Sequence, residues 1–369
     1  MKNRIIGIFV LLFLIPFVFC QRAFADSTQT YSRGIVRSID EQTQQQTAAG
    51  VGYTQKLRVQ EEPSGKMIEV QNGSNDLLLN STQLHHVGEE VVLVSEQDDQ
   101  GNEVVSITDQ YRIPPLLWLL GGFFIVVFFV ARFKGLQSVL GMFVSLGVLL
   151  FYMVPQITHG ADPVVTSLIA STVISAVIIY FGHSFNMKSH VALLCMVVTL
   201  FFTAGLAAAM VKFASLAGTG SDEAIYVQTN NTTTINLQGL LLGGIILAAL
   251  SVLDDSVVSQ VSVIAQLIDI KPHVTLHELY ERGMEVGKDH ISTLVNTLIL
   301  AYAGSSLPLF ILFSNASSQP VWVALNDQMI AEEVVRTLTG SIGLVLSIPL
   351  STLVASVVLL HFYHTKKQR

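Results

Sequence analysis

The sequence predicts an α-helical membrane protein with about seven spans, preceded by a small β domain. Hydrophobic residues make up 51% of the chain and charged residues only 13%, whereas an ordinary soluble domain carries about 25% charged residues. Long apolar runs reach the roughly 20 residues that a helix needs to cross a bilayer. Residues 26–112 instead are polar and rich in acids. These observations indicate one soluble domain attached to a helical membrane domain.

Residues 1–25 read as a signal peptide. Lys2 and Arg4 form a charged start, an apolar core follows, and an A-x-A pattern ends at Ala25. We expect cleavage after Ala25; the alternative is an uncleaved anchor, which gives the same topology. After cleavage Cys195 is the one cysteine left, so no intrachain disulfide can form.

Residues 26–112 show apolar residues with a period of two, separated by turn signals. The apolar positions are Ile35, Val36, Ile39, Leu57, Val59, Ile68, Val70, Val91 to Val94, Val104, Val105 and Ile107. Five or six short strands in this length predict a small barrel of the OB type. His85 and His86 lie in a loop of this domain, where we expect solvated surface rather than metal ligands.

The rest of the chain, residues 113–369, is predicted to form the membrane domain. Its expected spans are Pro114–Ala131, Leu136–Pro155, Val164–Phe181, Val191–Phe213, Leu237–Leu253, Thr293–Phe313 and Leu338–Phe362. Lysine and arginine gather in alternate loops, which by the positive-inside rule are cytoplasmic. The sequence thus predicts a multi-pass protein of the cell membrane with an extracytoplasmic β domain and a cytoplasmic C-terminus.

The longest inward loop, residues 254–292, is predicted to contain two helices. Val257, Val261, Ile264 and Ile268 recur at helical spacing, which indicates an amphipathic continuation of the sixth span. A second helix begins with a capping box.

That capping box consists of Thr275 and Glu278, whose side chains can satisfy the first free amides of a helix. Glu278 is also placed to pair with Arg282 four residues later.

Polar residues at the ends of the sixth and seventh predicted spans form the candidate site. Adjacent helical residues point about 100° apart, so at least one member of the first acidic pair should face the bundle. On the next span an aspartate, a threonine and an asparagine form one polar stripe. The candidate substrate-binding or ion-binding residues are Asp254, Asp255, Gln260, Asp289, His290, Thr293 and Asn296.

Two interpretations of these residues remain open. A charge at the bilayer centre costs about 2.5 to 3.5 kcal/mol, which favours a functional role, but Asp254 and Asp289 lie near the edge, where structural interface acids are equally expected. For Asn296 we expect an interhelical hydrogen bond rather than contact with a substrate.

Several segments resemble the YibE/F family of multi-pass membrane proteins. They are LDDSVVSQ, TLHELYERGMEVGKDHI and NTLILAYAGSSLPLFILF, together with YRIPPLLWLL, RFKGLQS, GADP and FGHSFNMKSHVAL. The resemblance covers nearly the whole mature chain. It implies an extracytoplasmic β domain followed by a helical membrane domain, and no established activity or substrate. The family's acidic pair corresponds to Asp254 and Asp255, its glycine-basic-Asp-His motif to Gly287 through His290, and its asparagine to Asn296.

Two functions fit this pattern best. The first is a transporter or permease for an ion or small solute, with the polar site at the cytoplasmic ends of spans six and seven. The segment Gly283 to Lys288 lacks the spacing of a P-loop, so an ion gradient or a partner's nucleotide hydrolysis would drive transport. The alternative is an envelope scaffold or accessory subunit whose outer β domain binds a membrane or envelope protein.

Other classes are less favoured. His277 and Glu278 resemble the start of a zincin motif, but Glu281 stands where the second histidine is required. No G-x-S-x-G nucleophile motif occurs, so enzymatic activity is not predicted. The sequence indicates no cofactor, leaves a metal open, and lacks the basic patch that nucleic acid would need. The lipid bilayer is the predicted surrounding.

Overall fold

The computed structural model describes residues 30–367 except 48–49, 74–77, 98–102, 231–233, 272, 309–310, 312–313 and 315–319. The predicted signal peptide, residues 1–25, lies outside the described residues. The chain divides into two compact units, Met1–Arg132 and Phe133–Arg369. Each unit is considered by itself.

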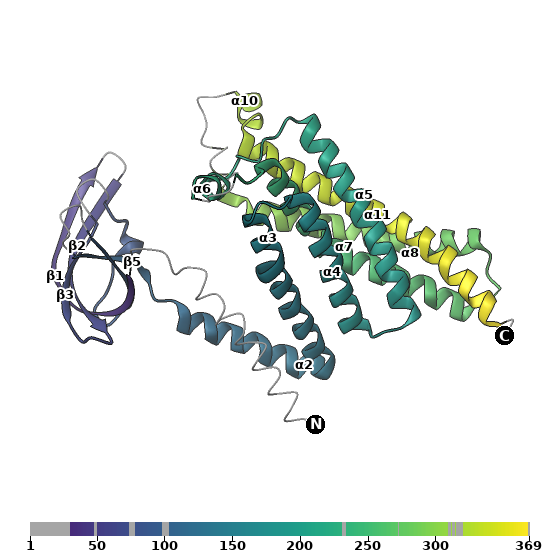
Figure 1. Cartoon of the computed structure of the whole chain (residues 1–369), viewed down its shortest axis with the longest axis horizontal. Helices are drawn as coiled ribbons and strands as arrows, with labels where there is room; N and C mark the ends of the chain where they lie inside the picture. The colour runs from purple at the N-terminus through teal and green to yellow at the C-terminus, as the bar shows by residue number, and fades with distance from the viewer. Residues whose placement is uncertain are drawn as a thin grey trace. The chain divides into compact units, whose positions relative to one another are not determined.

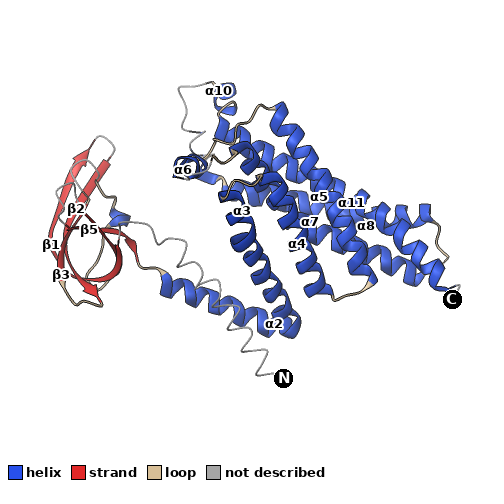
Figure 2. Cartoon of the chain, in the orientation of Figure 1, coloured by secondary structure: helices blue, strands red, loops and turns tan. Residues whose placement is uncertain are grey.

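The first unit contains a five-stranded antiparallel sheet (Figures 1 and 2). Its strands are β1 (Thr30–Thr47), β2 (Gly50–Glu62), β3 (Met67–Asn72), β4 (Glu90–Gln97) and β5 (Glu103–Gln110), in the order β3-β2-β1-β4-β5. A short 3-10 turn, η1 (Ser81–Gln83), lies between β3 and β4.

The sheet curls into a half-barrel around an apolar core. The register of β1 against β2 shifts between Val36 and Ser38, an irregularity that bends a strand, and the outermost strands β3 and β5 approach each other. Alternate residues face the core, as the period-two pattern predicts. The buried core residues are Val36, Leu57, Val59, Val70, Val91 and Leu93.

The helices follow the sheet. They are α2 (Ile113–Val148), a π-helical turn η2 (Leu149–Met153), α3 (Val154–Thr158), α4 (Pro163–His183), α5 (Met187–Phe213), α6 (Asp222–Asn230), α7 (Leu237–Ile270), α8 (Leu276–Ser305), α10 (Val321–Leu325) and α11 (Gln328–Lys367). Within α2, Arg132 has a left-handed φ of 51°, which separates two apolar segments.

Six of the described helical segments are long and apolar enough to cross a membrane. They are Ile113–Arg132, Gly135–Thr158, Pro163–His183, Met187–Phe213, Leu237–Ile270 and Gln328–Tyr363. The seventh predicted span, Thr293–Phe313, begins inside α8 and runs into residues outside the described part of the chain. The count of seven therefore stays a prediction.

The long inward loop differs in part from the expectation. Helix α7 continues the sixth span without a break to Ile270, as predicted. Helix α8, however, joins the second loop helix and the start of the predicted seventh span into one helix, Leu276–Ser305. No proline interrupts this stretch, and neighbouring helices pack closely against two of its glycines, Gly283 and Gly287. Helix α11 likewise starts at Gln328, earlier than the predicted Leu338.

Helices α4, α5, α7, α8 and α11 pack side by side in the second unit (Figure 1). Their shared core contains Met196, Leu200, Leu253 and Ile264, all at most 1% exposed. Helix α7 contacts each of the other four, so the polar side chains on its different faces meet different neighbours.

Candidate functional site

A junction of α7, α8 and α11 supports the candidate site. Gln260 on α7 is 2% exposed, and its Nε2 donates to the carbonyl oxygen of Gly283 on α8 at 2.8 Å and to Oγ1 of Thr352 on α11 at 2.7 Å. A Cβ added to Gly283 would lie 2.4 Å from Cδ1 of Ile264, and one added to Gly287 would lie 2.3 Å from Cγ2 of Ile348. Only glycine permits this close approach of helices.

Beside this junction an open groove of about 290 Å³ lies between α7 and α8. We call it the α7–α8 groove. It is lined by Ser259, Gln260, Val263, Val286, Asp289, His290 and Thr293. Residues from both helices that the sequence singled out, Gln260, Asp289, His290 and Thr293, therefore line one surface.

The α7–α8 groove offers groups that attract a cation. Asp289 is exposed, and Thr293 Oγ1 donates to the backbone oxygen of Asp289 at 3.3 Å. His290 Nε2 is buried and has no hydrogen-bond partner among the described residues. A carboxylate, an imidazole nitrogen and hydroxyl oxygens are ligands for cations.

A closed metal cage does not form from the described residues, where no three His, Cys, Asp or Glu side chains converge. His277 instead lies 3.2 Å from Glu281 in an exposed pair.

The acidic pair on α7 divides between two faces of the helix. Asp255 is exposed and precedes Ser259 by four residues, so both share the face toward the groove. Asp254 points about 100° away and is partly buried. Its Oδ1 is buried and has no hydrogen-bond partner in the described part of the chain. The two carboxylates thus do not act on the same surface.

Asn296 lies further along α8 and does not line the groove. It is exposed, and between described residues it makes no hydrogen bond to another helix, in contrast to the interhelical bond we expected. A helical turn beyond Thr293, it extends the polar stripe away from the groove.

The sequence did not single out a buried carboxylate at the start of α11. Glu332 is 6% exposed and accepts hydrogen bonds from the backbone N–H of Gly220 at 3.1 Å and from Gln328 Nε2 at 3.0 Å. Its neighbour Glu333 accepts one from Ser306 Oγ at 3.0 Å. The acidic pair before an apolar run was a usable signal, although the predicted spans leave it between Phe313 and Leu338, outside any helix.

The start of α8 agrees largely with the predicted cap. Thr275 Oγ1 accepts from the backbone N–H of Glu278 at 3.2 Å, and Arg282 Nε donates to the Glu278 carboxylate at 3.1 Å. That carboxylate also accepts from Lys271 Nζ at 2.8 Å, rather than turning back to the helix start. The hydrogen bond from Lys271 lowers the pKa of Glu278 below its ordinary value.

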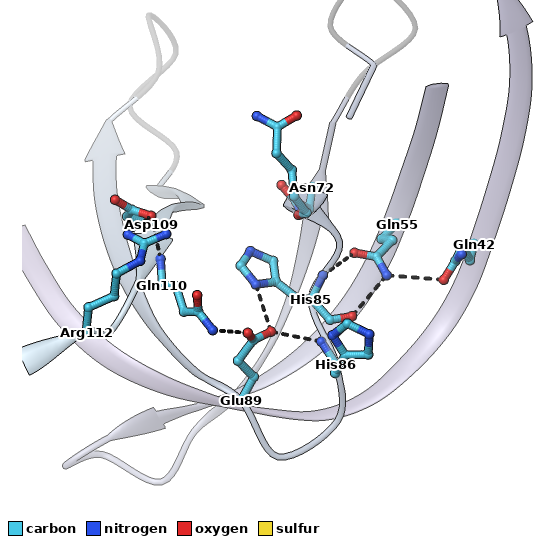
Figure 3. A network of polar contacts seen from close by, with 10 residues as sticks. Gln42, Gln55, Asn72, His85, His86, Glu89, Asp109, Gln110 and Arg112 are labelled. Atoms are coloured by element: carbon cyan, nitrogen blue, oxygen red, sulfur yellow. Dashed lines mark hydrogen bonds and ion pairs between the residues drawn. The ribbon is translucent and has the colours of Figure 1, made fainter. Parts of the chain in front are cut away.

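A second polar network lies in the β unit (Figure 3). Gln55 is 1% exposed; its Oε1 accepts from the backbone N–H of His85 at 2.9 Å, and its Nε2 donates to the backbone oxygen of His85 at 3.1 Å and to Gln42 Oε1 at 3.2 Å. Glu89 accepts from the backbone N–H of His86 at 2.9 Å and lies 3.1 Å from His85 Nδ1.

This network fixes the loop from His85 to Glu89. Gln110 Nε2 donates to the remaining carboxylate oxygen of Glu89. The prediction of solvated surface agrees with the exposed His86 but is wrong for His85, whose side chain is only 12% exposed. The side-chain amide of Gln55 and both carboxylate oxygens of Glu89 have partners within the same unit.

Close to this network, a hydrogen bond from the Arg112 guanidinium lowers the pKa of Asp109, and the backbone N–H of Gln110 acts in the same direction. The Arg112 Nη1 and Asp109 Oδ1 atoms are 2.6 Å apart. The pair is exposed, so it contributes little to stability.

Comparison with known proteins addresses identity. Curated proteins and solved structures gave no match. The sequence profile of YibE/F-like proteins matches residues 119–361, which is more than half of the 369-residue chain and includes all of the candidate residues. Together with the apolar helices, this match indicates a membrane protein and confirms the resemblance found in the sequence. The chain therefore belongs to the YibE/F-like protein family.

Proposed function

We propose that the protein is a multi-pass transporter that moves a cation across the membrane and binds it in the α7–α8 groove. The observation that carries this proposal is the groove itself, where Gln260, Asp289, His290 and Thr293 meet between two helices. Polar groups at helix contacts of a membrane domain are costly unless they are paired or used.

The chemistry of the groove supports a cation that needs only a few protein ligands. Asp289 supplies negative charge, and His290, whose Nε2 has no partner among the described residues, supplies an imidazole nitrogen. Because no three ligating side chains converge among the described residues, an alkali ion or a small alkylammonium ion fits better than a tightly caged transition metal.

The same proposal includes an orientation. The lysine and arginine bias puts the β domain outside the cell and the C-terminus in the cytoplasm. The groove would then lie near the cytoplasmic ends of the sixth span, on α7, and of the seventh span, which begins on α8. The proposal also includes the removal of residues 1–25 as a signal peptide and a total of seven spans. An ion gradient would supply the energy.

Charge movement in reconstituted vesicles tests the transporter directly. The purified full chain in liposomes is exposed by rapid exchange to Na⁺, K⁺ or methylammonium on a solid-supported membrane. We expect a transient current with at least one cation, reduced at least tenfold in Asp289→Asn. The exposed Glu285, one turn earlier on α8, provides the control Glu285→Gln, which should keep the current. No current with any probe, or equal currents in Asp289→Asn, contradicts the proposal.

A second candidate function is that of an envelope scaffold, and one observation favours it. The loop fixed by Gln55 and Glu89 holds Val87 at its tip, 62% exposed, next to Gly88 with a left-handed φ of 91°. A rigid apolar tip on an OB-type half-barrel is suited to partner contact.

Crosslinking tests the scaffold function. A photoreactive amino acid replaces Val87, and native membranes are irradiated before mild extraction. A scaffold gives one stoichiometric protein adduct. An adduct pattern identical to that of a probe placed at Glu69, on β3 of the same sheet, counts against specific recognition.

A further inference from the structure

Helices α4 and α7 run parallel in close contact. A Cβ added to Gly239 would lie 3.2 Å from Cδ of Pro163, and one added to Gly243 would lie 2.4 Å from Oγ of Ser167. Both pairs have the same offset along the two helices, so residues one turn further along each helix also come to the same level. By this register Asp254 lies just beyond the level of Ser175 on α4.

The α4 side of this contact carries a row of buried hydroxyls. Ser167, Ser171 and Ser175 follow each other at intervals of four and are all 0% exposed. Ser175 Oγ donates to the backbone oxygen of Ser171 at 2.8 Å, but the hydroxyls of Ser167 and Ser171 have no partner among the described residues. Asp254, at the end of this row, has the unpartnered Oδ1.

A cavity of about 120 Å³ lies beyond Asp254, between α4, α5 and α7. On α7 it is lined by Val258 and Ser262, which follow Asp254 at intervals of four and therefore share its face. His183 and Ser189 line it from α4 and α5. The hydroxyl row, the carboxyl group and the cavity thus follow one line along the α4–α7 contact.

Asp254 has no counter-charge in the described part of the chain. The titratable groups on the helices around this end of the bundle are Asp255 on α7, Tyr180 and His183 on α4, Lys188, His190 and Cys195 on α5, and Asp289 and His290 on α8; α11 has none between Arg336 and His361. None forms an ion pair with Asp254, and Lys188 Nζ lies 3.6 Å from Asp269. Uptake of a proton removes the buried charge of such a carboxylate.

We propose that Asp254 is a reversible proton-binding site, reached through the cavity and bordered by the hydroxyl row of Ser167, Ser171 and Ser175. The carboxylate takes up one proton to become a carboxylic acid and releases the same proton later, with no other reactant. Serine hydroxyls both donate and accept hydrogen bonds, so the row gives the carboxyl group polar surroundings in either protonation state. The use of this proton to drive a cation through the α7–α8 groove rests on the proposed function, whereas proton binding does not.

Dicyclohexylcarbodiimide provides the test, because this apolar reagent reacts with protonated carboxyl groups in apolar surroundings. The full-length wild-type protein in membranes is labelled over a range of pH, and the adduct is located by peptide mass spectrometry. We expect an adduct on Asp254 whose rate of formation falls at least tenfold from acidic to alkaline pH. No adduct on Asp254 at any pH, or a rate that does not change with pH, overturns the proposal.

A variant separates this result from the proposed function. Asp289→Asn should remove the cation current and leave the labelling of Asp254 unchanged. Asp289 lies on α8 and lines the α7–α8 groove, whereas Asp254 lies on the face of α7 that contacts α4. If labelling follows the predicted pH dependence while Asp289→Asn leaves transport intact, the proton site stands and the groove assignment falls. If Asp254 is not labelled in a protein whose current needs Asp289, the proton site falls alone.

Discussion

The loop network of the β unit and the acidic and imidazole groups of α7 and α8 differ in how far their hydrogen bonds are satisfied. In the β unit, Gln55 and Glu89 are bonded on each side and hold one loop in place (Figure 3). In the helical unit, Asp254 and His290 each leave one buried atom without a partner among the described residues. An unmade hydrogen bond costs free energy, so such groups persist where they serve a purpose beyond folding.

The difference is not a general property of the two units, because the helical unit also contains a buried polar side chain whose hydrogen bonds are made. Gln260 lies on the same helix as Asp254, is nearly as enclosed as Gln55, and still makes two interhelical hydrogen bonds. The helical unit therefore can satisfy a buried polar side chain where the role is structural. The following predictions, from the largest expected effect to the smallest, separate structural contacts from unpartnered groups.

The largest effect is expected at the glycine contacts of α8. In Gly287→Leu the new side chain meets Ile348, 2.3 Å from the position of its Cβ, and overpacking of this kind costs about 3 kcal/mol. Thermal unfolding in detergent should show a clear fall in Tm. The matched control is Gly304→Ala on the same helix, where a Cβ meets nothing within 4 Å; an equal loss in both variants would refute the packing argument.

The next effect is expected in the β unit. Gln55→Leu removes hydrogen bonds to Gln42 and to both backbone groups of His85, and the groups left unpaired cost about 2 to 3 kcal/mol. Limited proteolysis should then cut the loop between His85 and Glu89. Gln97→Leu, which replaces an exposed glutamine, should leave the loop resistant, and an uncut loop in Gln55→Leu would contradict a fastening role.

A smaller effect compares two positions on α7. Gln260→Leu loses bonds to Gly283 and Thr352 and should lower the free energy of unfolding by about 1 to 2 kcal/mol. Asp254→Leu removes a group with an unpartnered oxygen and should leave stability equal or raise it. Chemical unfolding in mixed micelles measures both. A larger loss of unfolding free energy for Asp254→Leu than for Gln260→Leu would show that Asp254, rather than Gln260, stabilises the fold, contrary to the prediction.

The smallest effect concerns the exposed cap of α8. Its partners lower the folded-state pKa of Glu278, so its contribution to stability is present above the unfolded pKa of about 4.3 and is lost as the pH falls through the lower folded value. Glu278→Gln should therefore lose a little stability at neutral pH and less in acid. Tm values at the two pH values check this, and an equal difference at both would count against it.

Much of the layout could be predicted from local patterns. The period-two alternation gave the strands of the half-barrel, and hydropathy gave the spans that the structure describes. The helix cap at Thr275 and the pair formed by Glu278 and Arg282 depend only on residues close in sequence. Local physics decides such features, so one sequence suffices.

Features that depend on packing could not be predicted. The sequence cannot show that Gln260 reaches Thr352, or that Asp254 and Asp255 divide between two surfaces, because these facts depend on the neighbours of α7. The burial of Glu332 likewise comes from Gly220, far away in the chain. The sequence identifies the candidate residues as polar and ionisable residues at the ends of predicted spans, but only the structure shows which of them line the α7–α8 groove.

Thiol accessibility in the groove tests the central claim most directly. In a background with Cys195→Ala and Cys20→Ser, Thr293→Cys and Phe202→Cys are compared for reaction with a membrane-impermeant, water-soluble methanethiosulfonate. Phe202 is 46% exposed within the α5 span and should face lipid. The account predicts fast modification of Thr293→Cys from one side of the membrane only and none of Phe202→Cys. Equal, slow reaction at both positions would show that the groove holds no water and contradict its role as a binding site.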